Sequence, residues 1–429
     1  MVTTSPSADA SNRAMYDARQ LGQRSHIGAK AAPLGWTRIG SFLLAGAVFF
    51  STWNLARVGT INFTLTDALL LCSLMILLAQ GRVTATPFGS LTPFWVGGLL
   101  MMLSGLFVSS LVNGEPLRWL NVASQYAMAY LGVTMLMMSQ DPNRTRRLCA
   151  VFVMGVTASE AIGVAASFFF TLDDVLPYFG DGFISGNGRV GAMAGEPNPN
   201  GASVAFAMPM LLYCLRERIL SPIVGLCCAV ILVWGLMLSA SFTGFTATSL
   251  AALVTITLLG VRYLARLLLA VVIAASIFLA SGAPLPSTFQ ERVGSAVESG
   301  DLNQAGTFVN RAELMEEAWH FAEDTAFIGM GVDQYRLVSA HDNPVHNLYL
   351  LIWNEGGIIA FAGLIAMLSM LLLLAVQGFR IRPREGAMAI SVVIVFLIYT
   401  SSLPHMYSRN WAVPIMLALS TIYARRAVS

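Results

Sequence analysis

Two arginines and one histidine stand out in this chain, because each lies in a polar segment between strongly apolar stretches. Arg189 lies in the glycine-rich loop 188–201 (GRVGAMAGEPNPNG), Arg311 opens a charged segment, and His346 begins the sequence HNLY. A planar guanidinium group can donate paired hydrogen bonds to a phosphate. A histidine with its ordinary pKa of about 6.5 can accept a proton near neutral pH. Together these side chains could bind an anionic leaving group and activate a hydroxyl.

The composition indicates an integral membrane protein. Hydrophobic residues make up 56% of the 429 residues, charged residues only 11%, and the mean hydropathy is +0.68, which is more apolar surface than a soluble core could enclose. Because a span needs roughly 20 apolar residues, the chain predicts about twelve transmembrane helices. Their expected centres lie near positions 48, 71, 101, 128, 159, 208, 230, 251, 272, 366, 395 and 417. The expected fold class is an all-α polytopic membrane protein.

The basic residues predict the orientation. Placing both termini in the cytoplasm puts most of the 25 lysines and arginines in cytoplasmic segments, in accord with the positive-inside rule. The net charge of +2 is spread along the chain rather than gathered in one patch, so nucleic acid is not an expected partner. The arginines left on the outer side are Arg57, Arg118, Arg189, Arg292, Arg311, Arg336 and Arg409.

The expected spans divide the chain into four parts, two of which carry long outer loops. The first part is a disordered cytoplasmic tail at 1–38, and the second holds helices one to nine at 39–281, with an outer loop near 171–200. The third is a large and partly helical outer loop at 282–345, between helices nine and ten. The fourth is an interfacial helix with helices ten to twelve at 346–429. Long loops on a rigid scaffold are where function concentrates.

One apolar stretch is too long for a single straight span. As one helix, 346–377 would be about 48 Å long, against a hydrocarbon core of about 30 Å. We therefore expect a break at Gly356-Gly357, which leaves His346 at the outer boundary of the membrane.

The surroundings of both arginines leave an ordinary explanation open. Glu196 and the prolines after Arg189 predict a turn, and Asn198 or Asn200 could cap the following helix, whose free N–H groups would attract phosphate. Arg189 could equally lie in an unremarkable turn. Arg311 could form a weak surface ion pair with one of the nearby acids Glu313, Glu316 and Glu317.

Position alone does not choose among the outer histidines, because His320, His341 and His405 share the outer side with His346. Asn347 follows His346, and Arg409 follows His405, so both are candidate supporting residues.

Two acids fall inside expected spans, where ionisable groups are usually functional. Asp67, near the outer end of its span, could face the site, whereas Glu160 is nearer mid-span and would suit proton-coupled transport. The five cysteines lie within or beside expected spans, so neither a disulfide framework nor a metal site is expected.

Three motifs in order resemble one known family. They are RVGAMAGEPNPN before a span, N-R-x-E-L-x-x-x-A-W ending in the GMG of 329–331, and H-N-L-Y-L-x-x-x-x-E-G-G entering the next span. Together with the large late loop, they resemble the O-antigen ligase and O-antigen (Wzy-type) polymerase superfamily of membrane glycosyltransferases, from about position 39 to the C-terminus. Two departures concern the subfamily: the turn 239–244 lacks the Ser-Arg pair of many relatives, and Met315 replaces a frequent aromatic residue.

The resemblance implies a GT-C-like fold in the bacterial inner membrane with a periplasmic active site. It implies transfer of a glycan from an undecaprenyl-diphosphate carrier to an acceptor sugar hydroxyl, by inversion and without metal or cofactor. The resemblance implies that Arg189 and Arg311 bind the diphosphate and that His346 is the base. The expected partners are the lipid-linked donor, the glycan acceptor and the lipid bilayer. Other polysaccharide assembly proteins are further candidates. The acceptor would make the enzyme a surface polysaccharide polymerase or an O-antigen-type ligase, and polymerase is slightly favoured.

Two other classes of function stay open from the sequence. A transporter or flippase of lipid-linked glycans would need polar residues along a membrane path, and Glu160 is the main candidate. A structural assembly protein would give no reason for the placement of Arg189, Arg311 and His346.

Overall fold

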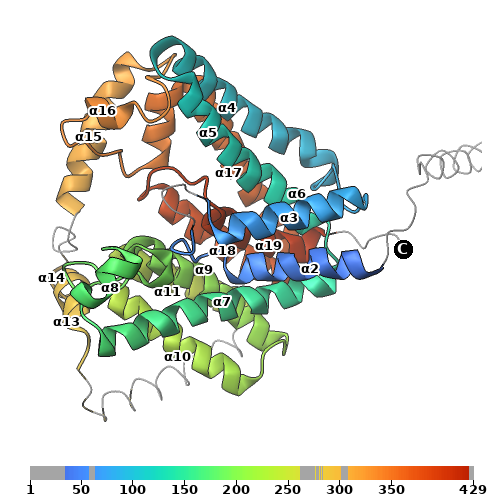
Figure 1. Cartoon of the computed structure of the whole chain (residues 1–429), viewed down its shortest axis with the longest axis vertical. Helices are drawn as coiled ribbons and strands as arrows, with labels where there is room; N and C mark the ends of the chain where they lie inside the picture. The colour runs from blue at the N-terminus through green and yellow to red at the C-terminus, as the bar shows by residue number, and fades with distance from the viewer. Residues whose placement is uncertain are drawn as a thin grey trace, which may run out of the picture.

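The computed structural model describes residues 34–57, 63–260, 284–300 and 308–424, together with three isolated positions between 260 and 284. In this part of the chain the regular structure is helical, apart from two isolated β-bridges. Figure 1 shows the arrangement of the helices. Their bounds are α2 Leu34–Phe49, α3 Leu65–Ala79, α4 Thr92–Asn113, α5 Pro116–Ala127, α6 Val133–Met138, α7 Pro142–Phe169, α8 Leu172–Phe179, α9 Pro197–Arg216, α10 Pro222–Ser239, α11 Phe242–Leu259, α13 Ser287–Phe289, α14 Ser295–Ser299, α15 Phe308–Asp324, α16 Tyr335–Val338, α17 Leu348–Ile381, α18 Pro383–Thr400 and α19 Arg409–Tyr423.

The all-helical fold class is confirmed, and helices cover every expected span centre except the one near 272, which lies outside the described residues. Among the described residues, six helices are long and apolar enough to cross a membrane. They include α7, α10, α11, α17 and α18, and α4 with the short 3-10 turn that precedes it. The total of about twelve stays a prediction, as do the four divisions of the chain.

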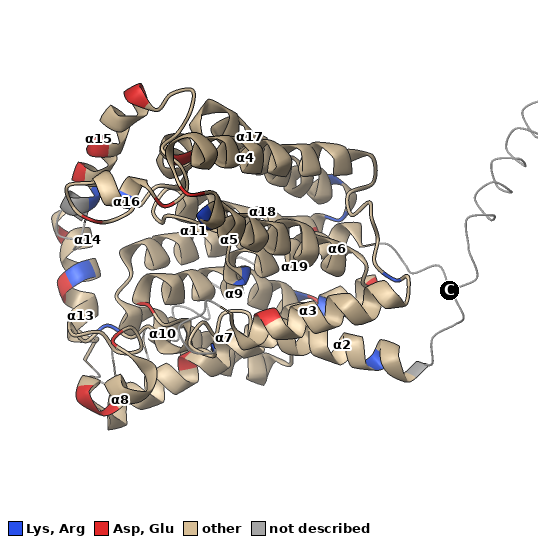
Figure 2. Ribbon diagram, turned by 45° about the horizontal axis from the view of Figure 1, so that its top comes forward, with Lys and Arg blue, Asp and Glu red and all other residues tan. Residues whose placement is uncertain are grey.

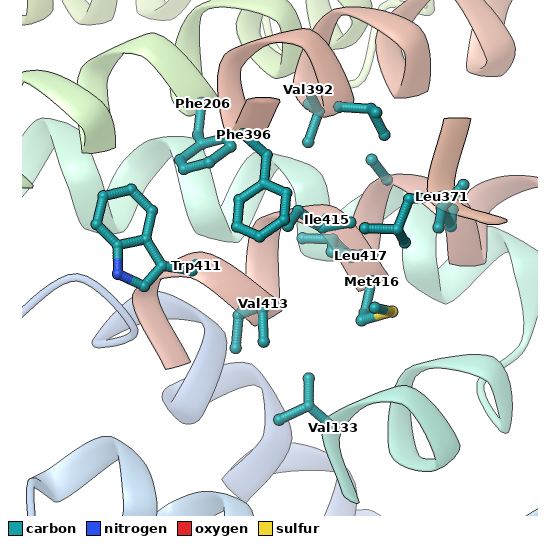
Figure 3. Packing of buried hydrophobic residues seen from close by; sticks show 14 of the residues in the cluster. Val133, Phe206, Leu371, Val392, Phe396, Trp411, Val413, Ile415, Met416 and Leu417 are labelled. Atoms are coloured by element: carbon teal, nitrogen blue, oxygen red, sulfur yellow. The ribbon is translucent and has the colours of Figure 1, made fainter. Parts of the chain in front are cut away.

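The most buried element is α19, near the C-terminus. Every residue of this helix from Arg409 to Ile422 is buried, and it packs against α6, α7, α17 and α18. Figure 3 shows the centre of this contact, where apolar side chains of α19 meet those of neighbouring helices. The rings of Phe206 and Trp411 meet edge to face, with centroids 6.1 Å apart. Because α19 carries a dense apolar core, it fixes the helices around it relative to one another.

Several helices expose apolar side chains, as expected for helices in lipid. Only 33% of the most apolar windows of α10 and of α11 is buried inside the protein. Figure 2 shows that most acidic and basic residues lie toward the ends of the helices, with long uncharged stretches between them. At the end predicted to be cytoplasmic, Arg384 pairs with Glu217 at 3.0 Å, and Arg146 pairs with Glu385. These six helices indicate a multi-pass membrane protein, whereas its orientation stays a prediction.

The expected break in α17 is confirmed. Gly357 has φ +67° and ψ −172° inside an otherwise helical segment, a backbone conformation that only glycine adopts readily. The segment 326–331 runs beside the break and forms hydrogen bonds with backbone groups of α17 on both sides of it. Met330 N donates to Asn354 O at 2.8 Å, Gly331 N to Glu355 O at 3.0 Å, and Ile358 N to Ala326 O at 3.0 Å. The outer arm of α17, residues 348–356, is therefore bonded to the large loop.

The same outer arm is tied to α15. The side-chain amide of Asn354 donates to Ala318 O at 2.8 Å, and its oxygen accepts from the Thr325 hydroxyl at 3.0 Å. Both polar ends of a fully buried side chain are thus satisfied, which is the condition for burying it at low cost. This contact sets the position of α15, and of Arg311 on it, relative to the start of α17.

Candidate functional site

Arg189 is held rigidly by the turn between α10 and α11. Only 8% of the residue is exposed. Its Nε donates to Ser239 O at 2.8 Å, and its Nη2 donates to Asn198 Oδ1 at 2.8 Å. Asn198 Oδ1 also accepts from the Ser241 hydroxyl at 3.2 Å. Three segments therefore meet at this guanidinium group, and Asn198 joins it to the Ser241 hydroxyl.

Asn200 connects the Arg189 loop to the intramembrane acid Glu160. Its amide donates to Glu160 Oε2 at 3.1 Å and, weakly, to Val190 O at 3.4 Å. Glu160 is fully buried and packs closely on Gly235, where an added Cβ would lie 2.0 Å from Glu160 Oε2. Glu160 therefore supports the loop that carries Arg189, and this contact gives no sign of a path across the membrane.

The predicted capping role of these asparagines is wrong. Glu196 is the N-cap of α9 and makes no side-chain capping bond, while Asn198 and Asn200 lie inside the first turns of the helix. The reason is that Pro197 occupies the first helical position, for which its fixed φ is suited, so the helix begins earlier. Asn198 instead accepts a hydrogen bond from Arg189, and Asn200 donates one to Glu160. Burial raises the pKa of the Glu196 carboxyl, while the nearby Arg57 lowers it.

Arg311 lies in the first turns of α15, and its positive charge acts on Arg189. Its Nε is buried and has no hydrogen-bond partner among the described residues. Within that part of the chain it forms no ion pair with the neighbouring glutamates. Glu317 instead accepts from Tyr335, Ser339 and the Ala340 amide. The structure therefore does not have the surface ion pair between Arg311 and Glu313, Glu316 or Glu317 that the sequence left open.

The charges of Arg189, Arg311 and Arg292 act on one another. Burial lowers the pKa of Arg189 to about 10, and the positive charges of Arg292 and Arg311 contribute to that lowering. The pKa of Arg311 is lowered mainly by burial and also by Arg292. Among the described residues these like charges form no ion pair with a carboxylate, and such an arrangement favours the binding of an anion, which would relieve their repulsion.

His346 stands beside this positive cluster in the form that a base requires. Its Nδ1 lies 3.0 Å from Pro344 O. A carbonyl oxygen can only accept, so Nδ1 carries the hydrogen and Nε2 keeps its lone pair. Burial lowers the pKa of His346, and the charge of Arg311 lowers it further. The half-buried imidazole is therefore neutral at neutral pH. Asn347 fixes its position by capping α17, accepting from Leu350 N at 3.1 Å.

Asp67 and Arg409 pair with each other. Arg409 Nη1 lies 3.0 Å from Asp67 Oδ2, and Nη2 donates to Asn54 Oδ1 at 3.2 Å. Asp67 also closes the capping box at the start of α3 with Thr64. The pair joins α3 to α19, and Asn54 donates to Ala194 O at 3.1 Å in the Arg189 loop. These two residues thus support the scaffold behind the site.

His405 belongs to a second polar group. His405 Nε2 lies 3.6 Å from Asp333 Oδ1 and 3.4 Å from Glu355 Oε2, and Arg118 pairs with Asp333. The two carboxylates raise the pKa of His405 to about 9 despite its burial, and the pKa of Asp333 falls to about 2 through hydrogen bonds and charge from His405 and Arg118. We name Arg118, Asp333, Glu355 and His405 the ionic network. A protonated His405 cannot act as a base.

Within the described residues, the ionic network also contains the one grouping with metal-ligand spacing. Atoms of Asp333, Glu355 and His405 lie within 4.8 Å of one another. With His405 protonated, the two acids are matched by two cations, so the network balances its own charge and needs no metal ion for neutrality.

Two residues near the arginines were not predicted as site residues. Arg292 appears in the sequence only as one of seven outer arginines, inside a turn-rich stretch. Tyr399, at the end of α18, has a buried hydroxyl, and its electrostatic influence reaches Arg189 and Arg311. A lone tyrosine in an apolar helix gives no sequence signal for such a position.

Comparison with known families matches one part of the chain. Residues 227–365 match the O-antigen ligase family model. The matched region runs from α10 through the large loop to α17 and includes Arg292, Arg311 and His346. The match confirms the predicted resemblance and indicates glycan transfer of the ligase or polymerase type, with a lipid-linked glycan donor and a glycan acceptor in a membrane. A comparison with curated protein sequences gives no match.

Proposed function

We propose that this protein is an inner-membrane glycosyltransferase that moves a glycan from an undecaprenyl-diphosphate carrier to an acceptor sugar hydroxyl at the periplasmic face. The observation that carries the proposal is the pairing of an uncompensated cationic cluster with a neutral histidine. Arg189 and Arg311 offer fixed positive charge, and His346 offers an unprotonated nitrogen beside it.

In the proposed reaction, the acceptor hydroxyl gives its proton to His346 Nε2 as its oxygen attacks the anomeric carbon. The bond between that carbon and the diphosphate oxygen breaks from the opposite side, so the configuration inverts. The departing diphosphate takes the bonding electrons, and Arg189 and Arg311 stabilise the charge that develops on it. Guanidinium groups thus serve where another enzyme would use a divalent cation, and neither a metal nor a cofactor is required.

The acceptor decides between two forms of the same chemistry. If it is another lipid-linked repeat, the protein is a surface polysaccharide polymerase, which we favour slightly. If it is a sugar of a lipid core or of a protein, the protein is a ligase of the O-antigen type. Mass analysis of surface glycans from a deletion strain separates them, since single repeats left on the carrier identify a polymerase and long unattached chains identify a ligase.

The reaction is tested with purified protein in detergent or lipid. Lipid-linked glycan and acceptor should yield polyprenyl diphosphate and the joined glycan in the presence of EDTA. Arg189→Gln and Arg311→Gln should weaken donor binding as well as turnover. A strict need for a divalent metal would contradict the arginine mechanism, and movement of the intact lipid-linked glycan across the bilayer without release of the diphosphate would identify a flippase instead.

A further inference from the structure

Arg292 is placed against the loop that carries Arg189. It lies in a short π-helical turn, Gln290–Gly294, which continues α13. At the start of this segment, Thr288 packs on Gly188, where an added Cβ would lie 3.4 Å from Thr288 Cγ2. Phe289 packs edge to face on Phe245 of α11, with ring centroids 5.8 Å apart. The segment is therefore docked on the scaffold of the site, although it is more than 100 positions from Arg189 along the chain.

Among the described residues, Arg292 has no ion pair and its Nε has no hydrogen-bond partner that would explain its position. Its Nε is buried and makes no hydrogen bond among the described residues, as is also true of Arg311. In the same part of the chain, none of the three arginines forms an ion pair. Leaving a buried charged donor unsatisfied is costly. Two such donors facing a third arginine indicate a site that is completed by an anionic ligand.

We infer that Arg292 is a third guanidinium ligand of the donor diphosphate, and that Arg189, Arg292 and Arg311 together match the leaving group better than the intact donor. This inference rests on the proposed function. In the donor, each phosphate of the diphosphate diester carries one ionised oxygen. When the bond to the anomeric carbon breaks, the diphosphate changes from a diester to a monoester, and its terminal phosphate gains a second ionisable oxygen with a pKa of about 6. The leaving group therefore gains a further negative charge.

The added charge gives the third arginine its role. The electron pair of the broken bond goes to the diphosphate oxygen, and the proton of the acceptor hydroxyl goes to His346, so the negative charge appears on the diphosphate alone. A ligand that meets this charge stabilises the transition state more than the bound donor, and such differential binding raises turnover rather than affinity for the donor. Arg292 should consequently affect the rate and the affinity for product more than the affinity for donor.

The test compares Arg292→Gln, Arg292→Lys and the control Arg336→Gln, in which an exposed arginine of the same large loop is changed. Farnesyl diphosphate serves as a short polyprenyl diphosphate, and its affinity and that of the lipid-linked donor are measured for each protein. Arg292→Gln should bind farnesyl diphosphate about ten- to a hundredfold more weakly, as expected for one charge-assisted hydrogen bond. Its kcat should fall by a similar factor while donor affinity changes less. Arg292→Lys should recover most of both.

Two results would overturn the inference. In the first, Arg292→Gln matches Arg336→Gln in product affinity and in kcat. In the second, Arg292→Gln weakens the binding of the lipid-linked donor and of farnesyl diphosphate equally, so that Arg292 does not respond to the charge gained on cleavage. If wild-type protein binds farnesyl diphosphate through Arg292 but never releases polyprenyl diphosphate from the donor, the anion site stands and the proposed transfer reaction fails.

Discussion

Two polar regions of this protein use the same kinds of side chain in opposite ways. In the ionic network, Arg118 and His405 are each paired with a carboxylate, and the charges cancel. Around Arg189, Arg292 and Arg311 the described residues form no ion pair, and positive charge accumulates on a rigid scaffold. A balanced group of buried charges is complete in itself and holds helices together, whereas an unbalanced one is complete only with a ligand.

The sharpest test of this contrast uses one histidine from each region, beginning with His346. His346→Ala should lower kcat by about two to four orders of magnitude, because a general base contributes roughly that factor. Its melting temperature should stay close to that of the wild type, since the ring makes one hydrogen bond to the described residues, with Pro344 O. Radiolabelled glycan transfer gives the rate, and His341→Ala, an exposed histidine of the same loop, is the control. Normal turnover in His346→Ala would move the base elsewhere.

His405 should behave in the opposite way. His405→Ala leaves the buried carboxylate of Glu355 without a partner, and breaking a buried ion pair costs about 3–5 kcal/mol of stability. Unfolding in detergent should show this loss. The double variant His405→Leu with Glu355→Leu removes one charge of each sign and should recover much of the stability. If the single variant is as stable as the wild type, the ionic network is not structural.

Substitutions of the two arginines should differ in their effect on the stability of the protein. Arg189→Gln should destabilise the protein by about 1–3 kcal/mol, because Ser239 O and Asn198 Oδ1 each lose the hydrogen bond that Arg189 donates, although Asn198 Oδ1 still accepts from the Ser241 hydroxyl. Arg311→Gln should leave stability unchanged or raise it slightly, since it removes a buried charge that is repelled by its neighbours. Melting curves without donor report both effects. A large destabilisation by Arg311→Gln would indicate a structural partner for this side chain.

The smallest expected effect concerns the pH dependence of transfer. A base must be unprotonated, so kcat/KM should fall as the pH drops through the pKa of His346, which lies below its ordinary value. Because the charge of Arg311 helps to lower that pKa, Arg311→Gln should move this acid limb to higher pH. The profile of Arg336→Gln should match the wild type. A limb that stays in place, or moves to lower pH, would show that Arg311 does not act on the base.

Much of the fold could be predicted because hydrophobic length and glycine positions act locally. The break at Gly357 followed from a stretch too long for one span, and the helices follow the apolar segments. The sequence could suggest that Arg189, Arg311 and His346 act together because all three fall in segments expected on the same side of the membrane, and their common site stays a prediction. The position of Glu196 as the residue just before α9 could not be predicted, since it depends on whether Pro197 or a later residue begins the helix.

The partners of buried polar groups could not be predicted from the sequence. His405 meets Asp333 and Glu355 only through tertiary packing, and Arg292 reaches Arg189 only because its segment docks on α11 and the Arg189 loop. In α15, the apolar residues Ala312, Met315, Trp319 and Ala322 are spaced as on one face of a helix. The structure buries Ala322 with Leu314 and Ala318, while Ala312, Met315 and Trp319 stay exposed. Helical spacing alone does not separate a face packed on protein from one turned outward.

The break in α17 makes the outer machinery independent of the thickness of the bilayer. His346 precedes the outer arm of α17, Arg311 lies on α15, and Asn354 bonds the two elements directly. A membrane that thins or thickens is accommodated by tilting of the span beyond Gly357. The spacing between the base and its neighbouring cation should therefore be the same in short-chain and long-chain lipids, so a change of host membrane would alter how the donor enters before it alters the chemistry.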